Sequence, residues 1–506
     1  MKKASKFEKF AARCWNLLNE GKPFTPIFTT GVMLLFTITK WDDPGFWPAF
    51  GTGFLLTLPF LVLYFIYDFP LFLRNYLYFP IIGLLLLGYE ANMLLWLLAA
   101  GVYFFFTVFF WGTIYYYLRI GTTLLNFTRF WKLVLKNSDS TSGNAQEQLP
   151  KVLLLLTIWH QPLSGTTIEQ NFVMELGLFF TGLLLYTLVL HRYLFDWKPV
   201  MYTNKTSNTA IPAKAVSDRV IVIVIDGMRK DRFEAADTPF LDKLRKEGTE
   251  YTQMETVYPA RTVVCFSSMF TGTYPEDHGI TSNMVYRLGI RTESIFDSLR
   301  KVNKKGRLLG IAHLVDAMGD DVETVTAVMH NDEADPNIMK RAKKIMLEQD
   351  PDFFAVQLIA TDQTGHSRGV LYDEYLQKIA EADALVEDFV SFLEENNMME
   401  NTTLVICADH GQADGIGGHG HLDEGERFVP FIMHGPHIKQ GLRIDEKQSL
   451  VSLAPTISYL MAAPYPSHSR GPVLTGALKD SQKSSEGART ENEHPNSKSH
   501  RISSRI

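Results

Sequence analysis

The stretch CADHGQADGIGGHGH, residues 407–421, concentrates side chains that can bind metal ions. It holds three histidines and two aspartates in a glycine-rich segment, where a solvated loop would ordinarily carry Ser, Lys or Asn. Carboxylate oxygen and imidazole nitrogen are ligands that Zn²⁺ accepts without sulfur. The three cysteines, Cys14, Cys265 and Cys407, are too scattered for a thiolate site or a disulfide framework. The stretch therefore predicts a metal site built from His and Asp.

Two other segments add the same kinds of ligand. Asp226 ends the apolar run VIVIVID, and TDQTGH carries Asp362 and His366 four residues apart. Taken singly, a carboxylate in such a place is more often a helix cap or a loop residue. Together with Asp409 and the histidines, however, these residues suffice for two metal ions with open positions. Two metal ions can clamp the attacking and leaving oxygens of a phosphoryl group.

A nucleophile for such a site is offered by YPARTVVCFSSMF, in which Thr262 begins an apolar helical pattern. The N-terminus of a helix stabilises anions, both an alkoxide and the oxygens of a phosphate. A plain helix cap is the commoner role of a threonine in this position. Beside the metal ligands, the segment indicates that Thr262 is the nucleophile.

The apolar run in DRVIVIVIDGMRKD, which stops at Asp226-Gly227, reads as a strand buried on both faces, as in a parallel sheet, and the runs in DFFAVQLIATD and TTLVICADHG read as further strands. Each run ends in an acidic residue, and open α/β sheets bind ligands at the carboxyl ends of their strands. Helical patterns lie between the runs, such as TPFLDKLRKEG. We therefore expect a doubly wound α/β catalytic domain over residues 219–476.

The motifs VIDGMR, YPARTVV, TGTYPEDHGITSN, TDQTGH and ADHG, in this order, resemble the alkaline phosphatase superfamily, specifically its type I phosphodiesterase/nucleotide pyrophosphatase branch. The resemblance covers roughly residues 219–476 and implies an alkaline-phosphatase-like fold. It also implies that Asp226, Asp409 and His410 bind one zinc ion together with Thr262.

The same resemblance implies that Asp362 and His366 bind a second zinc ion and that Asn283 donates a hydrogen bond to a phosphate oxygen. Nucleotide pyrophosphatases take their last histidine ligand from farther along the chain. The GGHGH segment is more similar to the membrane ethanolamine-phosphate transferases, so His419 is the expected last ligand and His421 the reserve.

The first 191 residues read as a transmembrane domain, since a membrane span needs about 20 apolar helical residues. Five spans are predicted near residues 25–41, 46–67, 76–89, 91–118 and 171–191. The short run at 152–161 is expected to form an interfacial or re-entrant helix. Residues 192–218 are expected to be a linker and residues 477–506 a disordered tail.

Five spans, with basic residues on alternate sides, predict a multi-pass protein of the cell membrane whose catalytic domain lies outside the cytoplasm. A sixth crossing would reverse that side. The formal net charge of −6 argues against a nucleic-acid partner, and the sequence does not indicate an oligomeric state.

These features predict a membrane-anchored phosphodiesterase or pyrophosphatase that uses two divalent metal ions and a phosphothreonine intermediate. Its substrate would be a phosphodiester, such as a lipid or glycan headgroup. Two alternatives stay open: transfer of phosphoethanolamine or phosphoglycerol onto a lipid or glycan, and a non-catalytic binding module.

Overall fold

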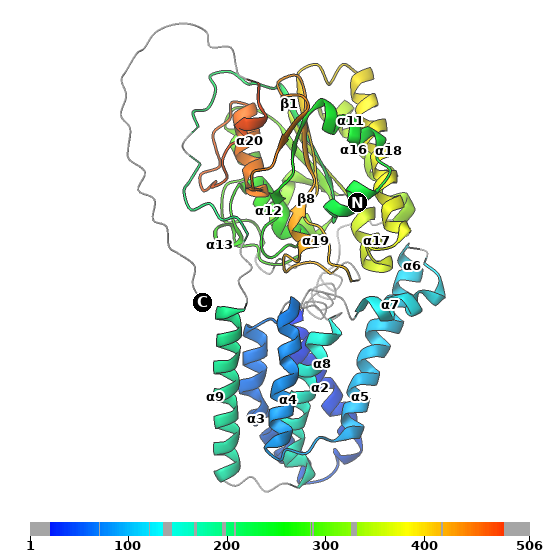
Figure 1. Ribbon diagram of the computed structural model, residues 1–506, viewed down its shortest axis with the longest axis vertical. Helices are drawn as coiled ribbons and strands as arrows, with labels where there is room; N and C mark the ends of the chain where they lie inside the picture. The colour runs from blue at the N-terminus through cyan, green and yellow to red at the C-terminus, as the bar shows by residue number, and fades with distance from the viewer. Residues whose placement is uncertain are drawn as a thin grey trace, which may run out of the picture.

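The structure is a computed structural model (Figure 1). It describes residues 21–479 apart from residues 70, 121, 135–143, 166–169, 195–198, 207–208, 284, 286–287, 325–330 and 416–417. The predicted tail therefore lies outside the described residues from residue 480 onward, as do the basic residues before Gly21. The described chain forms a helical N-terminal part and an α/β C-terminal part.

The C-terminal part is built on an eight-stranded sheet in the order β10-β2-β9-β7-β1-β6-β4-β5. Its strands are β1 (Arg219–Ile225), β2 (Thr249–Tyr251), β4 (Gly306–Gly310), β5 (Val322–Thr324), β6 (Phe353–Leu358), β7 (Thr402–Cys407), β9 (Phe431–His434) and β10 (Leu442–Ile444). Strand β9 runs antiparallel to both neighbours, whereas β7, β1, β6, β4 and β5 are parallel. The predicted alkaline-phosphatase-like fold is confirmed, with a mixed sheet.

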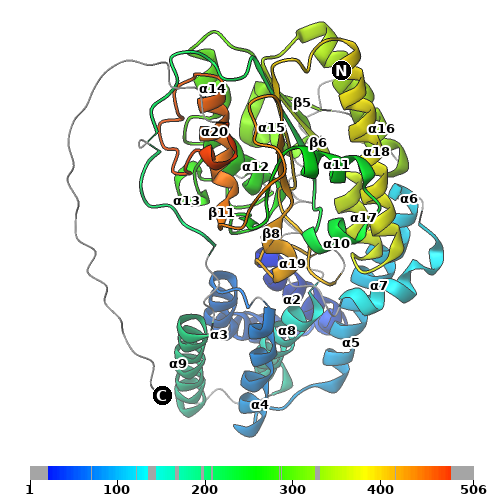
Figure 2. The same ribbon diagram turned by 45° about the horizontal axis from the view of Figure 1, so that its top comes forward.

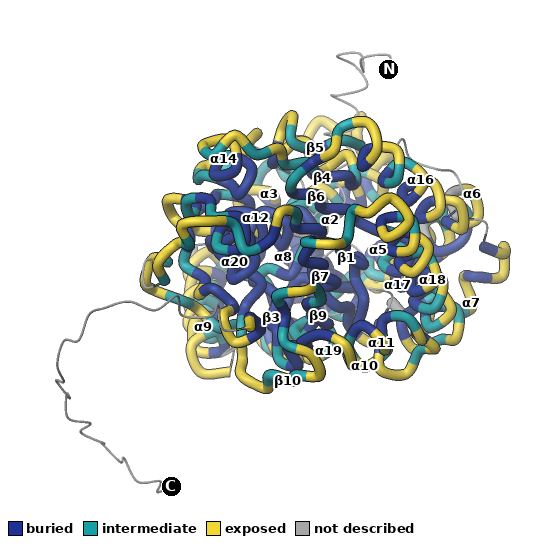
Figure 3. Tube along the Cα trace, turned by 90° about the horizontal axis from the view of Figure 1, so that it is seen from above, coloured by how far each residue is buried: buried dark blue, intermediate teal, exposed yellow. Residues whose placement is uncertain are grey.

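Helices cover both faces of this sheet, which runs between them in Figure 3. One face carries α12 (Thr262–Thr271), α13 (Pro275–His278), α14 (Ile295–Arg300), α15 (His313–Met318) and α20 (Leu453–Leu460). The other carries α10 (Lys230–Ala235), α11 (Pro239–Glu247), α16 (Asn331–Gln349), α17 (Ala360–Arg368) and α18 (Asp373–Glu395). A small sheet, β11-β3-β8, pairs Gln448–Ser449, Met254–Glu255 and Phe428–Val429, next to α19 (Glu424–Arg427).

The central strand β1 explains why the site forms where it does. Its residues from Val220 to Ile225 are fully buried and mostly β-branched, as in a strand covered on both faces. It pairs in parallel register with β6 and β7, so that Val224 lies opposite Gln357 and Cys407. The three strands therefore end together, and the residues that follow them meet at one edge of the sheet.

The N-terminal part packs six described helices side by side (Figures 1 and 2). They are α2 (Gly21–Thr37), α3 (Phe46–Ile66), α4 (Tyr78–Leu86), α5 (Met93–Phe104), α8 (Ala145–His160) and α9 (Gln170–Tyr193). Helix α5 continues through a π-helical stretch, η3 (Phe105–Tyr115), into α6 (Tyr116–Ile120). After η4 (Leu124–Asn126), helix α7 (Phe127–Val134) returns toward the bundle.

Three described helices are long and apolar enough to cross a membrane, fewer than the five spans expected. They are Phe46–Ile66, Met93–Leu118 and Asn171–Tyr193. The span expected at 25–41 corresponds to α2, which has 17 residues, and the span expected at 76–89 corresponds to α4, which has nine. Helix α4 continues directly from the 3-10 helix η2 (Leu71–Leu77), and the apolar helix that they form, Phe72–Leu86, is still shorter than a span.

The run at 152–161 lies within α8, which is not a surface helix. Of its residues 152–159, all but Leu153 are buried, and α8 packs against α2, α3, α4 and α5. Burial among neighbouring helices argues against an interfacial position, whereas a re-entrant helix, the other expectation, is compatible with it and stays a prediction. Thr25 at the start of α2 donates to Gln148 near the start of α8, so these two helices begin at the same end of the bundle.

Candidate active site

Seven predicted site residues converge at the edge of the sheet where β1, β6 and β7 end. Asp226 directly follows β1, Asp409 and His410 follow β7, and α17, after β6, carries Asp362 in its first turn and His366 in its last. Thr262 begins α12, and His419 comes from the glycine-rich loop after β7. The strand register brings these segments together although they are far apart in the sequence.

The first ligand group consists of Asp226, Asp409 and His410, which are almost completely buried. The Nε2 atom of His410 lies 3.5 Å from Oδ1 of Asp226 and 3.5 Å from Oδ2 of Asp409. Those two carboxylate oxygens are buried and have no hydrogen-bond partner among the described residues. Buried polar atoms of this kind are ordinarily satisfied, so a divalent cation fits between them.

The orientation of His410 also suits a metal ligand. Its Nδ1 lies 2.9 Å from the carbonyl oxygen of Gly411, to which it donates. The lone pair of Nε2 therefore faces the two carboxylates, as a second hydrogen bond commonly arranges for metal-binding histidines. The same Nε2 lies 3.2 Å from Oγ1 of Thr262.

The second ligand group consists of Asp362, His366 and His419. Oδ2 of Asp362 is 3.3 Å from Nε2 of His366, and Oδ1 is 3.8 Å from Nε2 of His419. The two histidine Nε2 atoms are 3.3 Å apart. Nδ1 of His419 donates to the carbonyl oxygen of Ala260 at 2.8 Å, which again turns Nε2 toward the site.

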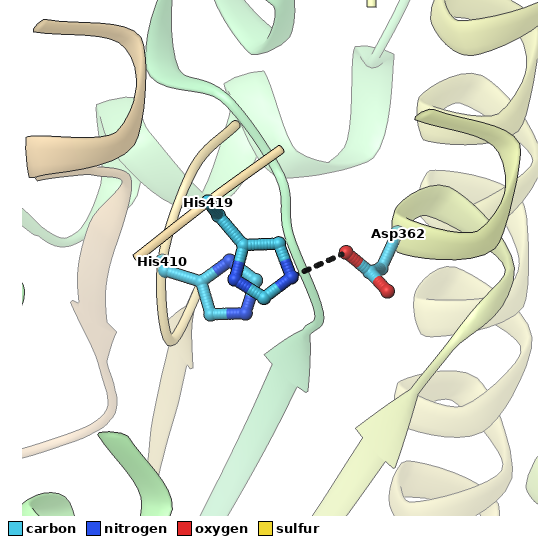
Figure 4. Close-up of side chains that lie close together, drawn as sticks. All are labelled: Asp362, His410 and His419. Atoms are coloured by element: carbon cyan, nitrogen blue, oxygen red, sulfur yellow. Dashed lines mark ion pairs between the residues drawn. The ribbon is translucent and has the colours of Figure 1, made fainter. Parts of the chain in front are cut away.

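The two groups share one space, as Figure 4 shows for Asp362, His410 and His419. The rings of His410 and His419 stack with centroids 3.9 Å apart. Ligand atoms of Asp362, His410 and His419 come within 4.8 Å of one another, as do those of Asp226, Asp409 and His410. His410 thus lies where the two ligand groups meet.

The electrostatics of the site favour a bound cation. Burial raises the pKa of Asp226 well above its ordinary value, and the neighbouring charges of Asp409 and Asp362 raise it further. Burial also lowers the pKa of His419 well below its ordinary value, with His410 adding to the effect. A positive ion between these residues would stabilise both the ionised carboxylates and the neutral imidazoles that metal binding requires.

Thr262 and Asn283 occupy the N-terminus of α12. Thr262 is nearly buried, and its Oγ1 atom faces His410. Oδ1 of Asn283 accepts a hydrogen bond from the backbone N–H of Val263 at 2.8 Å. Because Oδ1 is engaged in this way, the side-chain amide nitrogen of Asn283 is the donor available for a ligand at the helix start.

Three supporting residues were not predicted from the sequence. Gln357 donates to Oδ2 of Asp226 at 2.6 Å, and Gln412 donates to Oδ1 of Asp362 at 2.5 Å. Asp335, on α16, accepts from the backbone N–H groups of Ile359 and Ala360 and so caps α17. Gln357 could have been suspected, because an amide is unusual in an otherwise apolar buried strand; Asp335 left no such signal.

Gly227 lets the chain turn away directly after Asp226. It has a φ of +66°, and a Cβ atom there would lie 2.7 Å from Oδ1 of Asp362 and 2.9 Å from Nε2 of Gln412. Only glycine fits both this left-handed conformation and this close approach. The DG pair in the first motif therefore combines a ligand with the turn that makes room for the second group.

The reserve ligand, His421, is buried but belongs to neither ligand group. Its ring lies 6.1 Å from that of Tyr258. The position of His419 beside Asp362 and His366 favours His419 as the last ligand, which remains a prediction.

Comparison with known proteins supports this interpretation of the C-terminal part. Residues 220–330 and 313–464 match the family described as type I phosphodiesterase/nucleotide pyrophosphatase. The chain is 26% identical over 227 residues to human ectonucleotide pyrophosphatase/phosphodiesterase family member 1, covering 40% of this chain and 24% of that protein. It is 24% identical over 298 residues to GPI ethanolamine phosphate transferase 2 of Aspergillus fumigatus, covering 54% of this chain and 39% of the transferase.

Among solved structures, murine ectonucleotide pyrophosphatase/phosphodiesterase 5 aligns with a TM-score of 0.43 and 14% identity, over 49% of this chain and 96% of that one. The chain spans well under half of the length of the two curated relatives, the human phosphodiesterase and the fungal transferase. The family match covers the strands and loops that carry every predicted metal ligand and Thr262. The C-terminal part of the chain therefore belongs to the type I phosphodiesterase/nucleotide pyrophosphatase family, a branch of the alkaline phosphatase superfamily.

Proposed function

We propose that the protein is a membrane-anchored phosphodiesterase that uses two zinc ions and Thr262 to cleave a phosphodiester or pyrophosphate bond. The observation that carries the proposal is the position of Thr262. Its hydroxyl lies at the start of α12, 3.2 Å from Nε2 of His410 and beside two groups of buried ligands. A helix-capping role alone does not account for a hydroxyl in this position beside the candidate ligands.

In the proposed reaction, Oγ1 of Thr262 attacks phosphorus and the bond from phosphorus to the leaving alcohol breaks. The phosphoryl group is then esterified to Thr262, and a second attack by water releases it and restores the hydroxyl. Free N–H groups at the start of α12 and the amide of Asn283 stabilise the charge that develops on the phosphoryl oxygens. Two divalent ions held by the ligand groups would lower the pKa of the attacking hydroxyl and offset the charge on the departing oxygen.

Transfer of the phosphoryl group to an alcohol, rather than to water, is the second candidate function. It is supported by the match to an ethanolamine phosphate transferase, which covers more of this chain than the match to the human phosphodiesterase. The same residues would serve both reactions, because only the second acceptor differs.

The position of the site favours a substrate at the membrane surface. Ser367 and Arg368, which follow the ligand His366, contact Asn126 of the N-terminal part. The segments that carry the ligands therefore face the helical bundle rather than the far end of the molecule. A lipid or lipid-linked headgroup at the membrane surface would therefore lie close to the site.

We further propose that the site lies outside the cytoplasm. The proposal rests on the relatives whose names describe ectonucleotide and venom phosphodiesterases. The number of spans gives no firm support, because three described helices are long and apolar enough to cross a membrane whereas six helices pack in the bundle.

Replacing Thr262 tests the proposed nucleophile. We expect Thr262→Val to abolish hydrolysis of a nitrophenyl phosphodiester while the protein keeps its zinc, because the remaining ligands of the first group are untouched. Thr262→Ser should retain part of the activity, since serine supplies a hydroxyl in the same place. Elemental analysis and activity would be measured on the same full-length preparations.

Activity of Thr262→Val within a few-fold of the wild-type protein would show that Thr262 only caps the helix. Active wild-type protein without bound transition metal would contradict the two-metal part of the proposal. Supplying diacylglycerol or a sugar alcohol as acceptor, and following the labelled phosphoryl group, would separate transfer from hydrolysis.

A further inference from the structure

The N-terminal part contacts the catalytic domain through the segment that leads from α6 into α7. We call residues 122–130 the docking segment; it comprises η4 and the start of α7, and it lies against α17 and α18 (Figure 1). It comes after α6, which continues from the 11-residue π-helical stretch η3. π-Helical geometry is rare in proteins.

Asn126 is the centre of this contact. It is 3% exposed, and its side-chain nitrogen donates to the carbonyl oxygen of Gly112 at 2.7 Å and to that of Ser367 at 3.2 Å. Its Oδ1 accepts from the guanidinium of Arg368 at 3.2 Å. One buried amide thus joins the end of a membrane helix to the last turn of α17.

Arg129 adds a second point of contact on α18 and the loop before it. Its guanidinium forms an ion pair of 2.7 Å with Glu374 and lies 4.3 Å above the ring centre of Tyr372. Phe130 is buried and packs in one cluster with Val108 of η3, with Tyr372 against it. The docking segment is therefore fixed by polar, ionic and apolar contacts together.

These contacts lie directly beside a predicted metal ligand. Ser367 and Arg368 are the two residues that follow His366, and α17 has only nine residues. The His366 side chain is 36% exposed, whereas that of Asp362 is 13% exposed. Packing around the side chain thus restrains His366 less than Asp362, and its direction depends more on the backbone at the end of α17.

The two ends of α17 are held by different parts of the chain. Asp335 caps its first turn, and Gln412 binds Asp362 there. The docking segment holds its last turn through Asn126. The first ligand group, by contrast, follows β1 and β7. Where the side-chain hydrogen bonds and ion pairs of the described docking segment reach the catalytic domain, they go to α17 and α18.

We propose that Asn126 and Arg129 are positioning residues for the second metal: the membrane part holds the end of α17 so that His366 points into the site. This inference rests on the proposed function and adds that the affinity for one of the two metal ions depends on docking of the membrane part. Groups that hydrogen-bond a metal ligand directly change metal affinity by about 10- to 100-fold when removed; because Asn126 acts on the residues after His366 rather than on His366 itself, we expect an effect at the lower end of this range.

The test measures zinc affinity of the full-length protein in detergent by competition with a chromophoric chelator. We expect Asn126→Ala to weaken one of the two zinc ions by about 10-fold and to leave the other unchanged. Thr128→Ala is the matched control. Thr128 lies in the same segment but is exposed, and its hydroxyl bonds only the carbonyl oxygen of Leu125 within that segment.

A charge exchange provides a second test, in which only partly exposed side chains are replaced and no buried cavity is created. Arg129→Glu and Glu374→Arg should each weaken the same zinc ion by roughly two- to five-fold, as expected for a partly exposed ion pair. The double variant should restore much of the affinity, which a general loss of stability would not do. This cycle decides the matter if Asn126→Ala does not yield folded protein.

The inference would be overturned, and the proposed function left intact, if Asn126→Ala and the charge variants bound each of the two zinc ions as tightly as the wild-type protein does. Wild-type protein that binds no zinc and cleaves no diester would instead overturn the proposed function. Weakening of both zinc ions to the same degree would show that the docking segment stabilises the whole domain, and would also overturn the inference.

Discussion

At the scale of single residues, hydrogen bonding of the ring nitrogens, rather than burial, separates structural histidines from those that can bind metal. His278 is fully buried between α12 and α13. Its Nδ1 accepts from the backbone N–H of Ile280 at 3.1 Å, so its Nε2 carries the proton and donates to Oγ of Ser268 at 2.9 Å. Both ring nitrogens are thus used within the fold, and neither can bind a metal.

We expect His278 to make the protein less stable in acid. Burial lowers its pKa from 6.5 to about 3. Between these values the unfolded chain binds a proton and the folded chain does not, so the free energy of unfolding falls as the pH falls. The slope from this residue is up to about 1.4 kcal/mol per pH unit.

Thermal unfolding of the wild-type protein and His278→Gln would measure the effect over the interval from pH 6.5 down toward about 3, together with a reference point above pH 6.5. The melting temperature of the wild-type protein should fall more steeply below pH 6.5. Parallel curves for the two proteins would mean that His278 does not titrate in this way.

The ligand types could be predicted from the sequence, because each sits in a short motif at the end of an apolar run. The structure brings Asp226, Thr262, Asp362, His366 and Asp409 to one place, together with His410 and His419. Gln357 stands out as an amide in an apolar run, but its contact with Asp226 depends on strand pairing, and the contact of Asp335 with α17 depends on helix packing that no local pattern records.

At the scale of elements, the turn after β1 couples the two ligand groups. Gly227 joins Asp226 to the rest of the loop, and its backbone N–H donates to Asp409 at 3.2 Å. Asp362 approaches so closely that a side chain at this position would displace it. The turn thus sets the spacing between the carboxylates of Asp226, Asp362 and Asp409, which follow three different strands.

We therefore expect Gly227→Ala to lower zinc affinity and diesterase activity by about 10-fold or more, because the new methyl group pushes Asp362 away from the site. Gly441→Ala is the matched control. Gly441 has a similar φ of +63°, but a methyl group at this position would lie 3.6 Å from its nearest neighbour, the carbonyl oxygen of Lys246. The control carries the backbone strain of a left-handed residue without the clash.

Zinc content and activity would be measured on both variants. Equal losses in both would assign the effect to backbone strain alone, and no loss in Gly227→Ala would contradict the close packing described for this turn.

Element boundaries were predicted well where β-branched runs end in acidic residues, as in β1 and β7. They were predicted less well in the helical part. The hydropathy pattern of α8 does not show that four other helices surround it, since apolar residues face lipid and protein equally well. The antiparallel direction of β9 was also beyond local patterns, because strand direction depends on the path of the whole chain.

At the scale of the whole molecule, the number of membrane crossings determines the compartment of the site. Six alternating crossings would place the start of α2 and the catalytic domain on the same side of the membrane, whereas the three described helices that are long and apolar enough to cross would place them on opposite sides. Arg74 and Arg129 lie on the side of the catalytic domain, near Asp423 and Glu374, and basic residues of this kind favour the cytoplasmic face.

A reporter fused after residue 479, the last described residue, tests the proposed side. The reporter is a fused alkaline phosphatase, which is active only outside the cytoplasm. We expect this reporter to be active, and we expect no signal from a cytoplasmic reporter fused at the same position. The reverse pattern would contradict the extracytoplasmic placement and would favour a substrate on the cytoplasmic face of the membrane. The chemistry of the site would be unaffected by either result.

The central claim is that the reaction passes through a phosphothreonine at Thr262, and the stereochemistry at phosphorus tests it most directly. A phosphorothioate diester of known configuration would be hydrolysed in water labelled with ¹⁸O, and the configuration of the product determined. Two successive in-line attacks, first by Thr262 and then by water, predict net retention. Net inversion would mean that water attacks the diester directly, and would contradict the proposed role of Thr262.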